Sequence, residues 1–183
     1  MDNGASSYRR FLDGDEAAFD EIMRELFFGL VFFIEGYVHN VHTAEDIAMD
    51  VFSELIVHRN KYNFKVSLKT YLYMLGRSRA IDALRRRKAR ECTSLEEAMS
   101  LPDVGQSPEN AVLTDERKRA VHSAMAVLDE DMRRVVHLVY FEEMSYEDAA
   151  RVMKKKKKQI DNLLYRAKRE LRIILGKDGE HLL

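Results

Sequence analysis

The chain has 183 residues and a formal net charge of −1, which suits one ordinary domain or two small ones. Apolar residues make up 46 % of it, and the absence of tryptophan together with only two prolines and eight glycines favours a helical protein over an all-β one. The single cysteine, Cys92, excludes an internal disulfide and, with no CxxC motif or neighbouring histidine, argues against a thiolate metal site and fits a reducing cytosol.

No segment resembles a secretion signal or a membrane span. Residues 1–16 have no apolar core, so we do not expect a cleavable signal. The most apolar stretch, residues 26–38, is too short to cross a bilayer and contains Glu35, so we interpret it as a buried core helix. We therefore predict a soluble, cytoplasmic protein.

The first ninety residues predict a helical domain. Two helices, Asp15–Glu25 and Leu26–Asn40, are expected first, because their apolar residues recur at helical spacing. A third helix is expected to begin at Thr43, which stands in the position of an N-cap, and to run to about Arg59.

The third predicted helix has two faces of opposite character. Its apolar face recurs every fourth residue and consists of Ile47, Val51 and Leu55. Carboxylates recur at the same interval on another face, which we call the acidic face: Asp46, Asp50 and Glu54. Such a face is either solvated or binds a basic partner, and periodicity alone favours the solvated alternative.

A loop, Lys61–Val66, leads into a long helix that we expect to be capped by Ser67 and to end with the run RRRKAR at residues 85–90. This helix also carries Tyr71 and Tyr73. Cations mixed with aromatic rings suit single-stranded DNA, because its bases stack on rings while its backbone follows a basic groove. The alternative interpretation is that the two tyrosines are simply core residues.

Residues 91–107 form the one long stretch without helical periodicity. The stretch contains Pro102, Gly105 and several serines, and Pro108 follows it directly. We interpret it as a linker between a domain at residues 1–90 and a second domain at residues 108–183.

The second domain is expected to be helical as well. Ser107 as N-cap and Pro108 at the first helical position are a strong start signal, and Ser145 is expected to cap a later helix. The predicted helices are 108–127, 130–142, 146–153 and 157–174. The last two are joined by a short turn and the second is long and basic, which predicts a helix-turn-helix. No stretch alternates with period two, so we expect an all-α fold of two small domains without a sheet.

The last predicted helix begins within a run of five consecutive lysines at residues 154–158. In a helix-turn-helix the second helix enters the major groove, where cations hold phosphates and polar side chains contact base edges. The residues expected to bind phosphates are Lys156, Lys157 and Lys158, those expected to contact bases are Gln159, Asn162 and Arg166, and the same polar face carries Asp161 and Tyr165.

Charge is unevenly distributed along the chain. Counting Lys and Arg against Asp and Glu, the net charge is −8 for residues 1–60, +9 for residues 61–90, −9 for residues 91–150 and +7 for residues 151–183. Two basic segments in a nearly neutral chain predict two contacts with one polyanion, while the acidic segments remain for other partners.

The sequence does not support an enzyme. His39 and His42 are spaced for one helix face, but no carboxylate accompanies them in an HExxH-like pattern, and we interpret the histidines as structural or surface residues. The sequence has no P-loop, GxGxxG or GxSxG motif. We predict no catalytic residues, no metal and no cofactor, so a nucleic-acid-modifying enzyme is the weaker alternative.

Three segments, in this order, together resemble one family. These are TAEDIAMDVFSELIVHRNKY at 43–62, SLKTYLYMLGRSRAIDALRRRKA at 67–89 and LDEDMRRVVHLVYFEEMSYEDAARVMKKKKKQIDNLLYRAKREL at 128–171. They are similar to the polymerase-binding segment, the −10 helix and the C-terminal helix-turn-helix of bacterial RNA polymerase sigma factors of the extracytoplasmic-function (ECF) type, in the sigma-70 family. The resemblance extends from about Tyr8 to Leu175.

The resemblance implies two helical domains that bind core RNA polymerase and read promoter DNA at −10 and −35, the latter by the helix-turn-helix. It also implies that the acidic face meets a basic coiled coil on the largest polymerase subunit, which reverses the preference for a solvated face. The residues expected at the −10 DNA are Lys61, Asn63, Phe64, Lys65, Tyr73, Arg77, Ser78, Arg85 and Arg86. An anti-sigma factor is a further candidate partner, which the sequence leaves open, and no membrane insertion is expected.

The chain departs from the family pattern in two places. Lys154, Lys155 and Lys156 replace the usual Gly-Ile-Ser of the turn, so Lys155 is expected to lay its stem along apolar surface with its ammonium in water. Ser78 replaces an Asn near the −10 strand. A stand-alone helix-turn-helix regulator is the alternative within DNA-binding proteins, but it would leave the acidic face and the first basic segment without a use.

Overall fold

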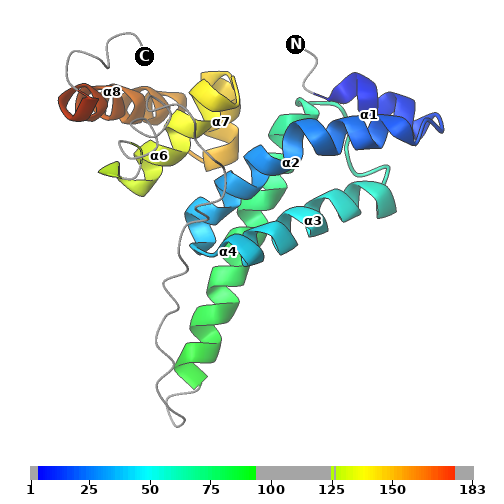
Figure 1. The fold of residues 1–183 in the computed structure, drawn as a ribbon, viewed down its shortest axis with the longest axis horizontal. Coiled ribbons are helices and arrows are strands. Elements are labelled where there is room, and N and C mark those ends of the chain that lie inside the picture. Colours follow the sequence, from blue (N-terminus) through cyan, green and yellow to red (C-terminus); the bar gives the residue numbers. More distant parts are fainter. Residues whose placement is uncertain (1–3, 94–124, 126, 176–183) are drawn as a thin grey trace, which may run out of the picture. The chain divides into compact units, whose positions relative to one another are not determined.

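The computed structural model describes residues 4–93, 125 and 127–175. The chain divides into two compact units, residues 1–107 and 108–183. Within the described residues every regular element is a helix, as the sequence predicts (Figure 1). The predicted linker lies outside the described residues from residue 94 onward, as does most of the predicted helix 108–127 with its cap at Ser107.

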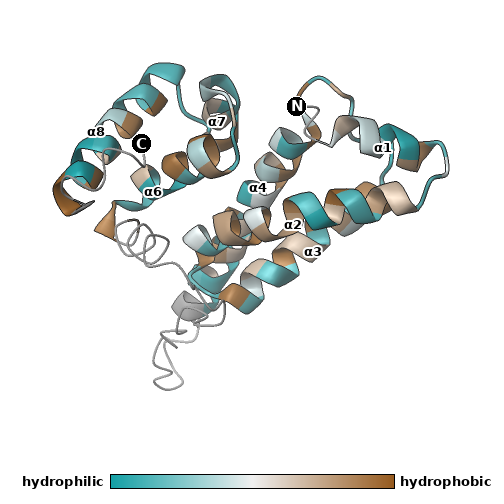
Figure 2. Cartoon of the chain, turned by 45° about the horizontal axis from the view of Figure 1, so that its top comes forward, coloured by the Kyte–Doolittle hydropathy of each residue, from teal (hydrophilic) through white to brown (hydrophobic). Residues whose placement is uncertain are grey.

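The first unit is built around its second helix. The unit consists of α1 (Ala5–Leu12), α2 (Ala17–Val38), α3 (Val41–Val57) and α4 (Leu68–Thr93), and α2 contacts each of the others. Figure 1 shows α2 and α3 side by side with α4 crossing them, and the arginine-rich end of α4 extends beyond them. Hydrophobic and hydrophilic residues alternate along α2 and α3 (Figure 2), and most of the apolar ones are buried in the core.

Helix α2 is one continuous helix, so the prediction of two helices meeting at Glu25 and Leu26 was wrong. Neither residue breaks a helix, and no capping residue or proline stands between them. The buried side chains Ile22, Leu26, Leu30 and Ile34 follow one another at intervals of four across the expected junction. Continuous packing against α3 and α4 therefore favours one helix.

Helix α1 was not predicted. Its eight residues are too few to hold a helix in water by themselves, so packing must stabilise it. Tyr8 and Phe11 are buried, and Arg10 Nη1 lies 2.9 Å from Glu21 Oε2 on α2. The three-residue spacing of the two aromatic residues was the only sequence signal for this element.

The N-cap of helix α3 lies three residues earlier than predicted. Its N-cap is Asn40, in extended conformation, whose Oδ1 accepts a hydrogen bond from the Thr43 N–H at 2.8 Å. Thr43 lies inside the first turn and is not the cap. His39 just before it has a φ of 53°, which ends α2 and sets the tight connection between the two helices.

Helix α4 begins as predicted and runs to Thr93, slightly beyond the expected end near residue 90. Ser67 Oγ accepts a hydrogen bond from the Thr70 N–H at 3.0 Å, which confirms Ser67 as the cap. At Gly76 a Cβ would come within 2.9 Å of Leu30 Cδ1, so this glycine permits the close approach of α4 to α2.

The second unit contains α6 (Glu130–Val136), a π-helical turn η1 (His137–Phe141), α7 (Tyr146–Met153) and α8 (Lys157–Leu175). Helix α7 has the predicted bounds, and its cap Ser145 accepts a hydrogen bond from the Asp148 N–H at 3.1 Å. The predicted helix 130–142 closes instead with the π-helical turn η1. Helix α8 packs on α6 and α7 through Ile160, Leu164, Ala167 and Leu171.

No helix within the described ranges is both long enough and apolar enough to cross a membrane. Residues 26–38, the most apolar stretch, belong to the buried helix α2, as predicted.

Candidate functional site: two basic surfaces and an acidic helix face

The turn between α7 and α8 is formed by lysines. Lys154 adopts the left-handed conformation, with φ 52° and ψ 44°. Its N–H donates to the Arg151 carbonyl at 3.2 Å, and the Lys155 N–H donates to the Ala150 carbonyl at 3.0 Å. This pair of bonds is a Schellman motif, in which glycine normally takes the left-handed position. The chain thus keeps the geometry of the usual turn although a lysine stands in place of the glycine.

The Lys155 side chain extends toward the start of α6. This side chain is 27 % exposed, and its Nζ lies 2.8 Å from Asp131 Oδ2 at the start of α6. Burial by itself would raise the pKa of Asp131, but the hydrogen bond from Lys155 and the charges of Lys155 and Arg134 outweigh it and lower that pKa. The ammonium was expected in water, and it instead forms an ion pair at the start of α6.

The start of α8 is capped by a reciprocal arrangement. Lys156 accepts a backbone hydrogen bond from the Gln159 N–H at 2.8 Å, and the Lys156 N–H donates to Gln159 Oε1 at 2.7 Å. This is the returning half of a capping box, in which a Gln three residues after the cap binds the N–H of the cap residue. Gln159, predicted to contact bases, therefore has its side-chain oxygen engaged in the helix start, which leaves its amide group for other contacts.

Lys157 is paired within the protein. Its Nζ lies 2.6 Å from Oε1 of Glu147 on the first turn of α7, and both side chains are more than half exposed. The hydrogen bond between the two groups lowers the pKa of Glu147 and raises that of Lys157. The three lysines predicted to bind phosphates therefore differ: Lys157 is paired with α7, whereas the exposed Lys158 forms no ion pair with the described residues.

The remaining polar residues predicted on α8 share its outer face. Tyr165 is 70 % exposed. The others, all exposed, are Asp161, Asn162 and Arg166. Since Ile160 and Leu164 pack inward, these side chains extend over the face that a major groove would meet.

The loop between α3 and α4 is shaped by aromatic and Asx contacts. Asn63 Oδ1 accepts a hydrogen bond from the Lys65 N–H at 3.1 Å, and the Tyr62 hydroxyl donates to the Val66 carbonyl at 2.7 Å. Phe64 between them has a φ of 58°, and its ring centroid lies 4.6 Å from that of Tyr62. Lys61, Asn63 and Lys65 are exposed, as contacts to DNA would require.

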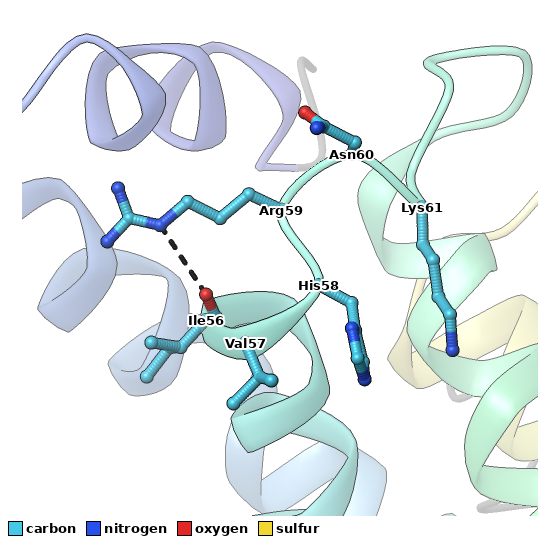
Figure 3. Close-up of a pocket in the computed structure, with 6 residues that line it drawn as sticks. All are labelled: Ile56, Val57, His58, Arg59, Asn60 and Lys61. Atoms are coloured by element: carbon cyan, nitrogen blue, oxygen red, sulfur yellow. Dashed lines mark hydrogen bonds between the residues drawn. The ribbon is translucent and has the colours of Figure 1, made fainter.

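A surface hollow of about 440 Å³ lies at the start of this loop. Its lining residues are Ile56, Val57, His58, Arg59, Asn60 and Lys61. In Figure 3 the side chains of His58 and Lys61 point to one side of the loop while Arg59 extends away from them, with its Nε donating to the Ile56 carbonyl at 3.4 Å. Apolar and cationic side chains thus adjoin at one exposed site.

Tyr73 is a core residue, so its prediction as a DNA contact was wrong. It is 0 % exposed, and its ring centroid lies 5.1 Å from that of Phe33 on α2. It points inward because it lies three residues before Gly76, on the side of α4 that approaches α2 closely. The other residues predicted on α4 are accessible: Ser78, Arg85 and Arg86 are exposed and Arg77 is half-buried.

The three carboxylates of the acidic face differ in their exposure to solvent. Asp46 and Asp50 are exposed. The Glu54 side chain is only 14 % exposed and binds Lys61 Nζ at 2.6 Å as well as the guanidinium of Arg79 on α4. The hydrogen bond from Lys61 lowers the pKa of Glu54, and although burial opposes this, Arg79 adds to it. Glu54 therefore joins α3 to the loop and to α4, and sequence periodicity could not separate it from the other two carboxylates.

Sequence reasoning also missed neighbours of the acidic face. Glu45 and Met49 lie on the same side of α3 as Asp46 and Asp50 and are exposed. Arg79 on α4 lies with its Nη1 3.4 Å from Asp50 Oδ2. The exposed surface of α3 thus mixes carboxylates with an apolar side chain.

These features define the class of the protein: a helical DNA-binding protein with a helix-turn-helix unit and a second unit that carries its own basic loop and helix. Residues 30–90 match the model of Sigma-70 region 2, and residues 118–171 match that of Sigma-70 region 4. The chain belongs to the sigma-70 family of RNA polymerase sigma factors and is of the ECF type. It binds core RNA polymerase and promoter DNA and directs promoter-specific transcription initiation.

Curated relatives and solved structures agree with this assignment. The chain is 29 % identical over 164 residues to the RNA polymerase sigma-H factor of Pseudomonas aeruginosa, covering 85 % of this chain and 84 % of the relative. It is 25 % identical over 159 residues to the ECF RNA polymerase sigma factor SigM of Bacillus subtilis, covering 86 % of this chain and 95 % of the relative.

The fold is similar to that of two solved proteins. RpoE of Bartonella quintana, solved in complex with the anti-sigma factor NepR, gives a TM-score of 0.62 at 20 % identity and covers 87 % of this chain and 98 % of its own. CnrH, solved in complex with the cytosolic domain of CnrY, gives 0.60 at 17 % identity and covers 97 % of this chain and 99 % of its own. At these identities the likeness shows the fold alone.

Proposed function

We propose that this sigma factor is a non-catalytic subunit that acts in the cytoplasm and divides its contacts among three surfaces. The first is the exposed part of the acidic face on α3, for polymerase; the second is the α3–α4 loop with the outer side of α4, for the −10 DNA; the third is the outer face of α8, for the −35 DNA. The observation that carries the proposal is that region 2 and region 4 matches fall one on each unit, each with an exposed basic surface.

At the −35 DNA, α8 is the reading helix. Its outer face presents Asn162 and Arg166, whose amide and guanidinium groups suit directional contacts to base edges. Lys156, Lys157 and Lys158 supply charge at its N-terminal end, where phosphates are reached. Gln159 contributes its amide group while its oxygen caps the helix. Asp161 and Tyr165 complete the exposed face.

At the −10 DNA, the loop and the outer side of α4 form one basic surface. Cations beside an aromatic ring suit a separated strand, whose bases stack while its phosphates follow the charges. The accessible members of this surface are Lys61, Asn63, Phe64, Lys65, Arg77, Ser78, Arg85 and Arg86. Strand separation in this scheme uses binding energy only and requires no catalytic group.

At the polymerase, Asp46 and Asp50 are the carboxylates available to a basic coiled coil on the largest subunit. Both are exposed, whereas Glu54 acts within the protein by holding the loop and α4. An anti-sigma factor that competes for these surfaces is a further candidate partner.

Reconstitution with core polymerase tests this proposal. The purified chain should be retained by immobilised core enzyme and, once bound, should support transcripts that begin at defined promoters on a fragment library. Binding to DNA without retention by core polymerase would instead identify a stand-alone regulator. Turnover of DNA or nucleotides by the chain alone would overturn the non-catalytic assignment.

A further inference from the structure

Helix α1 lies against the end of α3 and the loop that follows it, and Tyr8 makes the central contact. Tyr8 is 0 % exposed, and its hydroxyl lies 3.1 Å from both the Leu55 and the Arg59 carbonyl oxygens. The last carbonyls of a helix have no partner within it, so the hydroxyl supplies one from another element. The point where the chain leaves α3 is thereby tied to α1.

Arg9 reaches further into the loop. Its guanidinium carbon lies 4.9 Å from the centroid of the Phe64 ring, within cation–π range. Phe64 has a φ of 58°, a conformation that residues other than glycine rarely adopt and that the surroundings must hold. The Tyr8 ring also approaches Phe64, with 6.2 Å between centroids. Two consecutive residues of α1 therefore contact the one residue of the loop with a strained backbone.

A third contact comes from Phe11. The guanidinium of Arg59, at the beginning of the loop, lies 4.7 Å from the centroid of the Phe11 ring. Arg59 is thereby drawn toward α1 and away from His58 and Lys61, as Figure 3 shows. Both ends of the segment from Arg59 to Phe64 are thus held by one short helix.

We propose that α1 positions the α3–α4 loop for capture of the separated −10 DNA strand. Tyr8 and Arg9 are the positioning residues: they hold the loop and the Phe64 ring in the conformation that receives a base of that strand. This rests on the proposed function, which places the loop on that strand. Neither residue touches the base itself: Tyr8 is buried, and Arg9 acts through the Phe64 ring. The ligand is single-stranded DNA held by the holoenzyme.

The test measures binding of the holoenzyme to a fluorescent single-stranded oligonucleotide, whose sequence is first enriched from a randomised pool by the wild-type holoenzyme. Tyr8→Phe removes only the hydroxyl, and Arg9→Gln removes the cation. We expect each variant to bind the oligonucleotide about threefold to tenfold more weakly. Arg9→Lys keeps a cation over the ring and should remain within about twofold of wild type. Arg24→Gln, an exposed arginine on α2, is the matched control and should not change binding.

A double-mutant cycle separates positioning from direct contact. In a Phe64→Leu background, Arg9→Gln should cause no further loss, because both changes remove the same interaction. Additive losses would show that Arg9 meets the DNA itself and would overturn its assignment. Retention by core polymerase should be unchanged in Tyr8→Phe and Arg9→Gln, and a parallel loss there would overturn the positioning role in favour of a general folding defect.

Different outcomes would contradict the positioning role and the proposed function. If Lys65→Ala weakens oligonucleotide binding while Tyr8→Phe and Arg9→Gln do not, the positioning role is wrong and the proposed function stands. If the wild-type holoenzyme enriches no single-stranded sequence, or Lys65→Ala binds normally, the loop is not the −10 surface and the proposed function is wrong at that point.

Discussion

At the scale of single residues, the turn before α8 rests on a lysine in an unfavourable backbone conformation. Lys154 has a φ of 52°, and left-handed geometry costs a residue with a Cβ roughly 1–2 kcal/mol relative to glycine. The Schellman hydrogen bonds and the Lys155–Asp131 ion pair hold the turn nevertheless. The extra charge at this site is therefore obtained at some cost in local stability.

Replacing Lys154 by glycine should relieve that strain. We expect Lys154→Gly to raise the free energy of unfolding of the second unit by about 0.5–1 kcal/mol, because glycine adopts this conformation readily. Urea denaturation followed by circular dichroism measures the change. Lys158→Gly is the matched control: it removes the same charge in the first turn of α8, where glycine relieves no backbone strain, and should give no comparable gain in stability. Equal effects of the two substitutions would contradict the role of the backbone conformation.

Gln159 has a structural role that a glutamate can share. Gln159→Glu keeps an oxygen for the Lys156 N–H and adds favourable charge at a helix N-terminus, so stability should be unchanged or slightly higher. Gln159→Ala removes the cap and should cost about 0.5–2 kcal/mol. We expect both variants to alter sequence preference at −35, since both lack the amide donor. A selection of bound sequences by the holoenzyme tests this, and unaltered preference in Gln159→Glu would remove Gln159 from base contact.

The Lys155–Asp131 pair predicts a dependence of stability on pH. The folded-state pKa of Asp131 is lowered, so its carboxylate contributes stability above its ordinary pKa of about 4, and this contribution is lost as the pH falls through the lowered value. Asp131→Asn should therefore be less stable than wild type at pH 7, with a difference that narrows below about pH 4. Urea unfolding at several pH values measures it. In a Lys155→Met background the difference at pH 7 should be smaller, and an unchanged one would exclude the pair as its origin.

At the scale of elements, α3 performs two tasks with one row of carboxylates. Glu54 is bonded to Lys61 and Arg79 and holds the first unit together, while Asp46 and Asp50 face outward. Asp50 lies near Arg79, so its reversal would also disturb α4. Asp46 is therefore the better probe of polymerase binding.

Asp46→Arg should separate docking from folding. On an exposed helix face the change should alter stability by only about half a kcal/mol. Against a basic coiled coil it replaces attraction by repulsion, which costs several kcal/mol at an interface, so retention by core polymerase should be severely reduced. Asp20→Arg, at an exposed carboxylate on α2, is the control and should bind normally. A folded Asp46→Arg protein that binds core polymerase normally would remove the acidic face from the mechanism.

Elements with strong local signals could be predicted from the sequence, and those that depend on packing could not. Ser67 and Ser145 mark helix starts that the structure confirms, because their side chains satisfy N–H groups nearby in the chain. Helix α1 and the continuity of α2 depend on contacts between distant segments. The candidate site divides in the same way. The exposed face of α8 could be predicted from periodicity. The burial of Tyr73 and the pairing of Glu54 could not, because they depend on how α4 crosses α2 and α3.

At the scale of the whole molecule, acidic and basic segments alternate twice along the chain, and each unit contains an acidic and a basic segment. In both units some of these opposite charges meet: Glu54 with Arg79 in the first, and Glu147 with Lys157 in the second. Opposite charges therefore offset one another within each unit and not only between the two units.

Limited proteolysis tests the division into two units. The composition of residues 91–107 predicts that cleavage occurs there first, and because α4 continues to Thr93 we expect it within residues 94–107. Mass spectrometry should then find two fragments, both helical by circular dichroism. Early cleavage inside α6, α7 or α8 would contradict an independently folded second unit.

The bridge between Lys157 and Glu147 bears on how salt affects promoter binding. A lysine that binds a phosphate normally frees one small cation from the DNA, and the number of cations freed sets the slope of log affinity against log salt. When Lys157 moves to a phosphate, however, Glu147 loses its partner and attracts a cation in turn. Cation uptake at Glu147 therefore offsets part of the release at Lys157, and nothing of this kind offsets it at Lys158. The salt slope therefore counts fewer contacts than the number of lysines at the start of α8, and a shallow slope is compatible with every one of them reaching the DNA.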